Sequence, residues 1–226
     1  MKKSNLILSA LLLMLLTFTN CGSSSTEGSS VMNAESSTNT EVTIGKQVWM
    51  KENLNVSKFR NGNPIPEAKT KEEWEQAGKN KEPACCYYDN DPTNGVKYGK
   101  LYNWYAVNDP RGLAPAGYHI PRDAEWTILT DYLGGRSVAG GKMKTPSGWK
   151  ASNTDASNSS GFSGLPGGYR LHGGAFKFIG EGGGWWSSTE RKTSSAWGRG
   201  LSYRDGNVYM DDAKKYNGIS VRCLRD

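Results

Sequence analysis

Several features that mark common enzyme and metal sites are missing from this sequence of 226 residues. It has only two histidines, His119 and His172, and their spacing does not resemble that of a metal-ligand pair. Its four cysteines include no Cys-x-x-Cys motif, and there is no Gly-x-Ser-x-Gly, His-Glu-x-x-His or phosphate-binding loop. We therefore expect no catalytic site and no cofactor, and we consider a redox or metal centre a poor explanation of the cysteines.

Long apolar runs are also scarce, because only residues 6–16 form one. That run is too short to span a bilayer permanently, and it lies between two lysines and Cys21, as in an export signal. A cysteine at the cleavage point predicts a lipoprotein whose acylated Cys21 holds it on a membrane. Asn20 departs from the small residue usual before such a cysteine. Ordinary secretory cleavage is the alternative, although no Ala-x-Ala motif supports it.

The composition divides the chain into three parts. Residues 1–20 form the predicted signal peptide, and residues 21–41 are mostly Ser, Thr, Asn, Gly and Glu. Such a stretch buries too little apolar surface to offset its ordering entropy, so we expect a flexible tether after the lipidated cysteine. Residues 42–226 are long enough for one domain with a single substantial core. We expect an exported cell-envelope protein, attached to the outer membrane; whether it faces the periplasm or the exterior is left open.

The charge balance is basic, with 28 Lys and Arg against 22 Asp and Glu. A basic surface attracts acidic glycans, anionic lipids or nucleic acid. Here, however, the charges are scattered without a basic run, and export argues against nucleic acid as a partner. The sequence favours an ordinary solvated surface for these scattered residues: Lys69, Lys71, Lys79, Lys81, Arg136, Lys142 and Lys150.

Three cysteines remain beyond Cys21, in a compartment that permits disulfides. Cys85 and Cys86 are adjacent and therefore unsuited to pairing with each other. We expect one of them to bridge to Cys223 and the other to be free or buried.

Apolar periodicity predicts an α+β fold with two short helices, a twisted antiparallel sheet and long Gly-rich loops. A hairpin is expected at residues 41–50, around Gly45-Lys46. One helix should follow the capping box that begins at Thr70 and end at Gly78. A longer helix should start near Pro121 and bury one face, formed by Trp126, Leu129 and Leu133. Strands are expected at residues 169–171, 175–179, 185–188, 196–203, 207–210 and 219–224.

The late strands carry the candidate ligand-binding residues. Aromatic faces stack on the flat apolar faces of sugar rings, and polar side chains near a hairpin end assist binding. Some of these aromatic residues must belong to the core. The aromatic candidates are Trp185, Trp186, Trp197, Tyr203 and Tyr209, and the polar candidates are Arg199, Arg204, Asp205, Asn207 and Asp211.

A weak candidate metal loop precedes them. Asp89, Asp91 and Thr93 alternate as oxygen donors in the manner of a calcium loop. However, Gly95 falls one place late for the helix-loop-helix pattern, and no Glu stands at the twelfth position. A turn capped by its own side chains explains the segment better, so calcium is unsupported as a cofactor.

The order of several motifs resembles that of the Fibrobacter succinogenes major paralogous domain. The matching segments are Ile44–Leu54, Tyr98–Val107, Leu113–Pro121, Gly161–Arg170, Trp185–Thr189 and Gly218–Cys223. The resemblance implies an exported protein or lipoprotein with a C-type-lectin-like fold. It also implies that the cysteine before the aromatic pair Tyr87-Tyr88 forms the disulfide, which would be Cys86–Cys223.

Together these features predict a cell-envelope lipoprotein that displays a non-catalytic binding domain for a polysaccharide or a surface protein. The alternative is a structural or assembly subunit of a surface appendage or envelope complex. An enzyme is the least favoured reading.

Overall fold

The computed structural model of the protein describes residues 40–226. The predicted signal peptide, the predicted lipidation site Cys21 and nearly all of the tether lie outside this range. Within it, no helix is both long and apolar enough to cross a membrane. Short helices and antiparallel sheets make up the described part, which confirms the predicted α+β class.

The strands form a four-stranded sheet in the order β1-β2-β11-β5, a three-stranded sheet in the order β10-β9-β8, and two pairs. In chain order they are β1 (Glu41–Ile44), β2 (Gln47–Met50), β3 (Cys85–Cys86), β4 (Leu101–Tyr102), β5 (Tyr118–His119), β6 (Gly167–Arg170), β7 (Phe176–Ile179), β8 (Gly182–Lys192), β9 (Ser195–Ser202), β10 (Tyr209–Lys214) and β11 (Leu224–Arg225).

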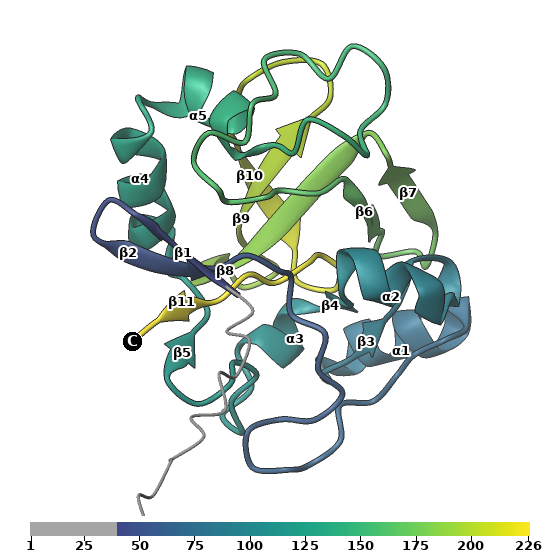
Figure 1. Ribbon diagram of the computed structural model, residues 1–226. Coiled ribbons are helices and arrows are strands. Elements are labelled where there is room, and N and C mark those ends of the chain that lie inside the picture. The colour runs from purple at the N-terminus through teal and green to yellow at the C-terminus, as the bar shows by residue number, and fades with distance from the viewer. Residues whose placement is uncertain (1–39) are drawn as a thin grey trace, which may run out of the picture. The chain divides into compact units, whose positions relative to one another are not determined.

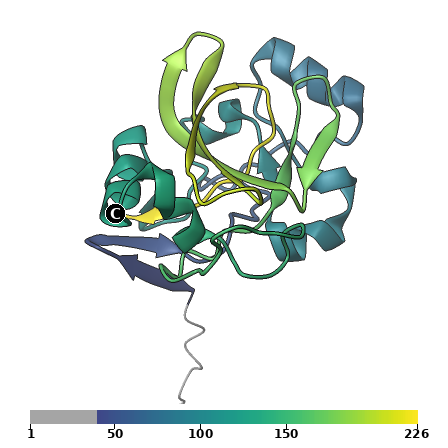
Figure 2. The same cartoon turned by 90° about the horizontal axis from the view of Figure 1, so that it is seen from above.

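The helices precede the late sheet along the chain. They are α1 (Lys71–Asn80), a short 3-10 turn η1 (Tyr88–Asn90), α2 (Pro92–Tyr98), α3 (Trp104–Val107), α4 (Asp123–Tyr132) and α5 (Arg136–Met143). Figure 2 shows α4 and α5 on one side of the late strands and α1 on the opposite side.

The first sheet closes the domain by bringing its two ends together (Figure 1). The predicted β1–β2 hairpin is confirmed, with Val42 opposite Trp49 and Gly45 in the left-handed turn that glycine permits. Leu224 of β11 pairs with Trp49 on one side and with His119 of β5 on the other. The last strand therefore lies between the first hairpin and the middle of the chain.

The first predicted helix begins as expected but ends later. The Thr70 hydroxyl accepts a hydrogen bond from the Glu73 amide at 3.1 Å, and the Glu73 carboxylate accepts one from the Thr70 amide at 2.9 Å. This capping box fixes the first turn of α1. Gly78 does not end the helix, which continues until Lys81 takes a left-handed conformation with φ of 59°.

The second predicted helix, α4, packs as its sequence indicated. Trp126 and Leu129 are fully buried and Leu133 is 6% exposed. Their spacing places them on one helix face, and that face contacts an aromatic cluster. In this cluster the ring of Trp126 lies 4.7 Å from that of Trp49 and 6.5 Å from that of Trp185, between centroids.

Other parts of the predicted fold were wrong. The described residues contain five α-helices where two were expected, because α2, α3 and α5 are short and lack a clear apolar period. Several small sheets replace the single twisted sheet. The last strand is shorter than predicted, since Ile219 and Ser220 make only isolated bridges, to Tyr102 and Trp185.

A buried arginine joins several of these parts. The guanidinium of Arg222 donates to the carbonyl oxygens of Met50 at 3.1 Å and Phe162 at 2.6 Å. It also donates twice to the side-chain oxygen of Asn53, which accepts a further bond from the Trp185 indole. Burial lowers the pKa of Arg222 to about 9, because no solvent stabilises its charge.

The predicted disulfide is not present in the structure. Cys85, Cys86 and Cys223 are all buried free thiols. The two adjacent cysteines point to opposite faces of β3, since side chains alternate along a strand. Cys86 packs in a cluster with Trp74, whereas Cys85 and Cys223 belong to a different cluster, in which they are also unbonded. The Cys86–Cys223 pairing therefore requires a rearrangement of the core.

The thiols should be unreactive in the native protein. Burial raises the pKa of Cys85 and Cys223 to about 12 and that of Cys86 to about 11, so very little thiolate exists near neutral pH. We expect iodoacetamide to label none of them in folded residues 40–226 and all three in guanidinium chloride, as counted by mass spectrometry. A single label in denaturant would instead show that a disulfide forms.

Candidate functional site

A cleft of about 270 Å³ opens at one end of the late sheet, where the turn between β7 and β8 faces the start of β10. Four aromatic residues line it: Tyr169, Phe178, Tyr203 and Tyr209. The rings of Tyr169 and Phe178 meet edge to face with centroids 6.1 Å apart. Phe178 is 53% exposed and Tyr209 is 40% exposed. The cleft therefore presents open aromatic surface in a concave setting.

The backbone of Phe178 is unusual. Its φ is 67°, in the left-handed region that bulky residues rarely adopt. Such a conformation costs roughly 1–3 kcal/mol and tends to occur at functional sites. The turn is closed by a hydrogen bond from the Glu181 amide to the Phe178 carbonyl at 2.9 Å. The turn keeps the Phe178 ring at the edge of the cleft, although the exposure of an apolar ring to water is unfavourable.

Glycines form the floor beneath these rings: Gly182 and Gly200 line the cleft, and Gly184 lies against the ring of Tyr169. Gly184 pairs with Gly200, which in turn pairs with Tyr209, and directly opposed residues point to the same face of a sheet. A Cβ atom on Gly184 would lie 2.3 Å from Cε1 of Tyr169. One on Gly200 would lie 2.7 Å from Oδ2 of Asp211. The absence of side chains lets the tyrosine ring and the carboxylate lie against the sheet.

One wall of the cleft is built around Tyr203. The Lys150 ammonium lies 5.3 Å from its ring centroid, and the Arg204 guanidinium lies 5.4 Å from it. Lys150 also pairs with the carboxylate of Glu181 at 2.8 Å, which lowers the pKa of that carboxyl group. Arg204 is exposed, and Arg204 and Glu181 both line the cleft. They provide a hydrogen-bond donor and acceptor beside the aromatic rings.

The hairpin between β9 and β10 positions the opposite wall. The Asp205 carboxylate accepts a bond from the Tyr209 hydroxyl at 2.5 Å and from the Asn207 amide at 2.9 Å. The buried ammonium of Lys144 donates to the Asp205 carbonyl at 2.8 Å. The bond to Asp205 raises the pKa of Tyr209, so its hydroxyl stays protonated. Asp205 and Asn207 therefore shape the hairpin and do not line the cleft.

Asp211 lies between the cleft and a neighbouring hollow of about 260 Å³. Desolvation raises the pKa of its carboxyl group, and the positive charges of Arg199 and Arg136 oppose that rise. A carboxyl group in such a place accepts hydrogen bonds from ligand hydroxyls when ionised and donates one when protonated.

Three of the predicted contact residues belong to the interior. Trp185 is 1% exposed and Trp186 is fully buried, with its indole donating to the Tyr102 carbonyl at 2.8 Å. Arg199 is 3% exposed and pairs with Asp123 at 2.6 Å. Contrary to the prediction, these three side chains are buried and do not line the cleft, so they cannot contact a ligand there.

Trp197 also lies away from the cleft. It is opposite Asp212, whereas Gly198 and Gly200 face the cleft side, and successive residues of a strand point to opposite faces. Its ring is covered by the Arg191 guanidinium at 4.4 Å. Of the predicted contact residues, Tyr203, Arg204, Tyr209 and Asp211 are the ones that line the cleft.

The sequence reasoning missed Tyr169, Phe178 and Glu181 as contact residues. They come from β6, β7 and the following turn, which the fold brings beside β9 and β10. One signal could have located the floor: residues 182–184 are all glycine, and glycines recur at 198 and 200. Glycines at opposed positions of two paired strands leave part of one face without side chains.

Comparison with known proteins identifies the family. The model of the Fibrobacter succinogenes major domain matches residues 42–225. The chain belongs to this family. The match spans the whole fold from β1 to β11, so the cleft, the sheets and the three buried thiols all lie within the family domain. No curated protein and no solved structure matches the chain.

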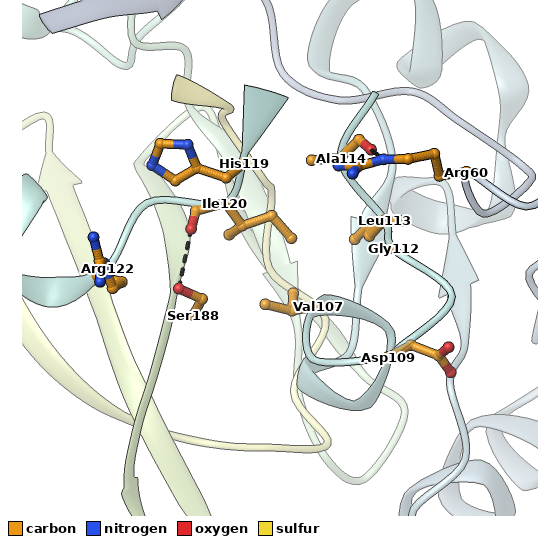
Figure 3. Close-up of a pocket in the computed structure, with 10 residues that line it drawn as sticks. All are labelled: Arg60, Val107, Asp109, Gly112, Leu113, Ala114, His119, Ile120, Arg122 and Ser188. Carbon is orange, nitrogen blue, oxygen red and sulfur yellow. Dashed lines mark hydrogen bonds between the residues drawn. The ribbon is translucent and has the colours of Figure 1, made fainter. Parts of the chain in front are cut away.

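A second hollow, of about 420 Å³, lies beside β5 and the start of α4 (Figure 3). In Figure 3 Ile120 and Val107 lie near its centre, with Arg60 to one side and His119 and Arg122 to the other.

The polar groups of this hollow mostly bond to the chain itself. Arg60 donates to the carbonyl oxygens of Ala114 and Tyr118, each at 3.0 Å. The Ser188 hydroxyl donates to the Ile120 carbonyl at 3.0 Å, the dashed line in Figure 3. The ring nitrogens of His119 lie 2.8 and 3.1 Å from two carboxylates, of Asp226 and Glu125. These contacts hold loops together, so we do not place the ligand site here.

The weak calcium loop is a helix start. Asp91 caps α2, its carboxylate accepting bonds from the amide and the hydroxyl of Thr93 at 2.9 and 2.7 Å. Asp89 lies within the preceding η1 turn. Nowhere in residues 40–226 do three or more His, Cys, Asp or Glu side chains gather as a metal site.

Replacing Gly184 should disturb the cleft floor. In Gly184→Ala the new methyl group would collide with the Tyr169 ring, and overpacking of this kind costs about 1–3 kcal/mol. We expect the melting temperature to fall by several degrees. Gly173→Ala is the matched control, because its nearest neighbour would be 3.9 Å away. Equal melting temperatures for the two variants in calorimetry would contradict this account of the floor.

Proposed function

We propose that this domain binds carbohydrate and that a sugar ring enters the cleft between Phe178 and Tyr209. The observation that carries the proposal is the exposure of these two rings over a floor of glycine and Tyr169. An exposed aromatic face gains free energy when it covers the apolar C–H face of a sugar. Because glycine has no side chain, it leaves space above the sheet into which a flat sugar ring fits.

The polar groups around the rings support the same proposal. Arg204 offers donors, Glu181 offers an ionised acceptor, and the Tyr209 hydroxyl is held by Asp205. Sugar hydroxyls both donate and accept hydrogen bonds, so a mixed set of this kind matches them. We assign Asp211, which lines the cleft, to hydrogen bonding with the ligand.

The domain would act at the cell envelope. The export signal and Cys21 support a lipoprotein, with the tether of residues 21–41 between the acyl anchor and the domain. The mass of the mature N-terminus tests this assignment. We also propose a C-type-lectin-like fold, supported by the pairing of the first hairpin with the last strand and by the separate late sheet.

An assembly subunit is the second candidate function, and an apolar patch on the helices favours it. Ile128, Tyr132 and Val138 are 54%, 66% and 46% exposed. Ile128 and Tyr132 are one helical turn apart on α4, and Val138 lies on the adjoining α5. Exposed apolar side chains gathered on one surface commonly mark a protein interface.

A glycan array with the soluble domain, residues 40–226, tests the main proposal. We expect saturable binding that weakens by about tenfold in Tyr209→Ala and in Phe178→Ala, equivalent to about 1.4 kcal/mol for each lost ring. Both side chains are exposed, so the variants should fold. Trp186→Ala is unsuitable as a binding test, because that indole is part of the core.

Tyr132→Ala is the control for this experiment, since it removes an exposed aromatic ring on α4 that does not line the cleft. It should bind like the unchanged domain. Absence of binding to any glycan, or an equal loss in all three variants, would rule out the cleft as a sugar site. Release of new reducing ends from a bound polysaccharide would point to hydrolysis.

Sedimentation of the same domain tests the assembly candidate. If the α4–α5 patch is an interface, association should increase with protein concentration and weaken in Ile128→Lys and Tyr132→Lys. The control is Val96→Lys, at a residue on α2 that is 90% exposed. A monomer at all concentrations would exclude self-association through the patch.

A further inference from the structure

A third hollow lies at the far end of the late sheet, separate from the cleft and from the hollow beside β5. It has a volume of about 500 Å³ and is bounded by the end of α1, by α3, and by the turns after β6 and β8. Three flat rings line it: Tyr105, His172 and Tyr216. The last two meet edge to face with centroids 5.5 Å apart. None of these residues lines the cleft proposed for sugar binding.

Three lysines surround this hollow without acidic partners. Lys79 and Lys81 line it from the end of α1, and Lys214 lies beside it, 3.3 Å from Nε2 of His172. All three are exposed, and none forms an ion pair in the described part of the chain. Glu75 is the only carboxylate among the lining residues, and Lys71 lies 3.8 Å from it. The hollow therefore has an uncompensated positive charge.

Hydroxyl groups complete the lining. Thr193 and Ser194 contribute theirs from the turn between β8 and β9, and Tyr105 contributes its phenol. Burial raises the pKa of Tyr105, with a further contribution from Tyr216, so the phenol stays a hydrogen-bond donor. Flat rings, hydroxyl groups and free ammonium groups thus face one space.

We propose that this hollow is a second binding site, which takes an acidic sugar: a ring that carries a carboxylate. The rings of Tyr105 and Tyr216 would cover the sugar face, and Lys79, Lys81 and Lys214 would balance its charge. A phosphorylated lipid headgroup would match the charge, but it does not need the ring surface. The site is separate from the cleft, so it stands or falls independently of the proposed function.

Calorimetry with an oligogalacturonate and the corresponding neutral galactose oligosaccharide tests the site on residues 40–226. We expect the acidic ligand to bind more tightly than the neutral one, and its affinity to fall with added salt. The double variant Lys79→Gln and Lys214→Gln should bind the acidic ligand at least tenfold more weakly. Tyr209→Ala, in the cleft, should bind it as the unchanged domain does.

The control variant is Lys46→Gln with Lys58→Gln. These two exposed lysines also lack ion pairs among residues 40–226, so the control removes the same charge at another place. An equal loss of affinity for oligogalacturonate in both double variants would show nonspecific charge attraction and would contradict the proposed site. Equal affinity for the acidic and neutral sugars would also overturn it. Binding to phosphatidylglycerol vesicles but not to oligogalacturonate would overturn the assignment in favour of a lipid surface.

Discussion

The buried guanidinium of Arg222 is the interaction on which the rest of the structure depends. A charged group without water must have its donors satisfied, and here they are met by oxygens from β2, from the following loop and from the segment at Phe162. Removing the charge would leave these oxygens unpaired, and moving any of the segments would leave the charge unpaired. The same Asn53 oxygen holds the Trp185 indole, so the network also fixes the start of β8. The closure of the domain and the position of the late sheet are thereby coupled.

The two faces of that sheet have different tasks. Trp185 and Leu201 extend from one face into the aromatic core around Trp126, where close packing supplies stability. On the other face Gly184 and Gly200 leave space, and Tyr169 lies across part of it. In β9 Arg199 and Leu201 alternate with Gly198 and Gly200, so core packing on one face and open surface on the other come from one pattern. This explains why most of the tryptophans are structural and why tyrosines and a phenylalanine form the cleft.

Local signals in the sequence were sufficient for some elements. The β1–β2 hairpin, the capping box of α1 and the buried face of α4 each depend on residues close together in the chain, and each was predicted. The short helices α2, α3 and α5 were missed because a few residues give no clear period. The Cys86–Cys223 pairing is absent because Cys86 lies in a different core cluster from Cys223, and no local pattern tells which cluster each of two adjacent cysteines enters.

Local propensity and motif order were enough to predict the family, the α+β class and the aromatic and polar composition of the late strands. Which of those residues meet depends on the tertiary fold. Phe178 and Glu181 join Tyr209 because the β7–β8 turn folds over the sheet. Lys79, which the sequence favoured as a scattered surface charge, and Lys214 come together at the other end. Both sites are assembled from segments distant in the chain, and the packing of the core is what brings those segments together.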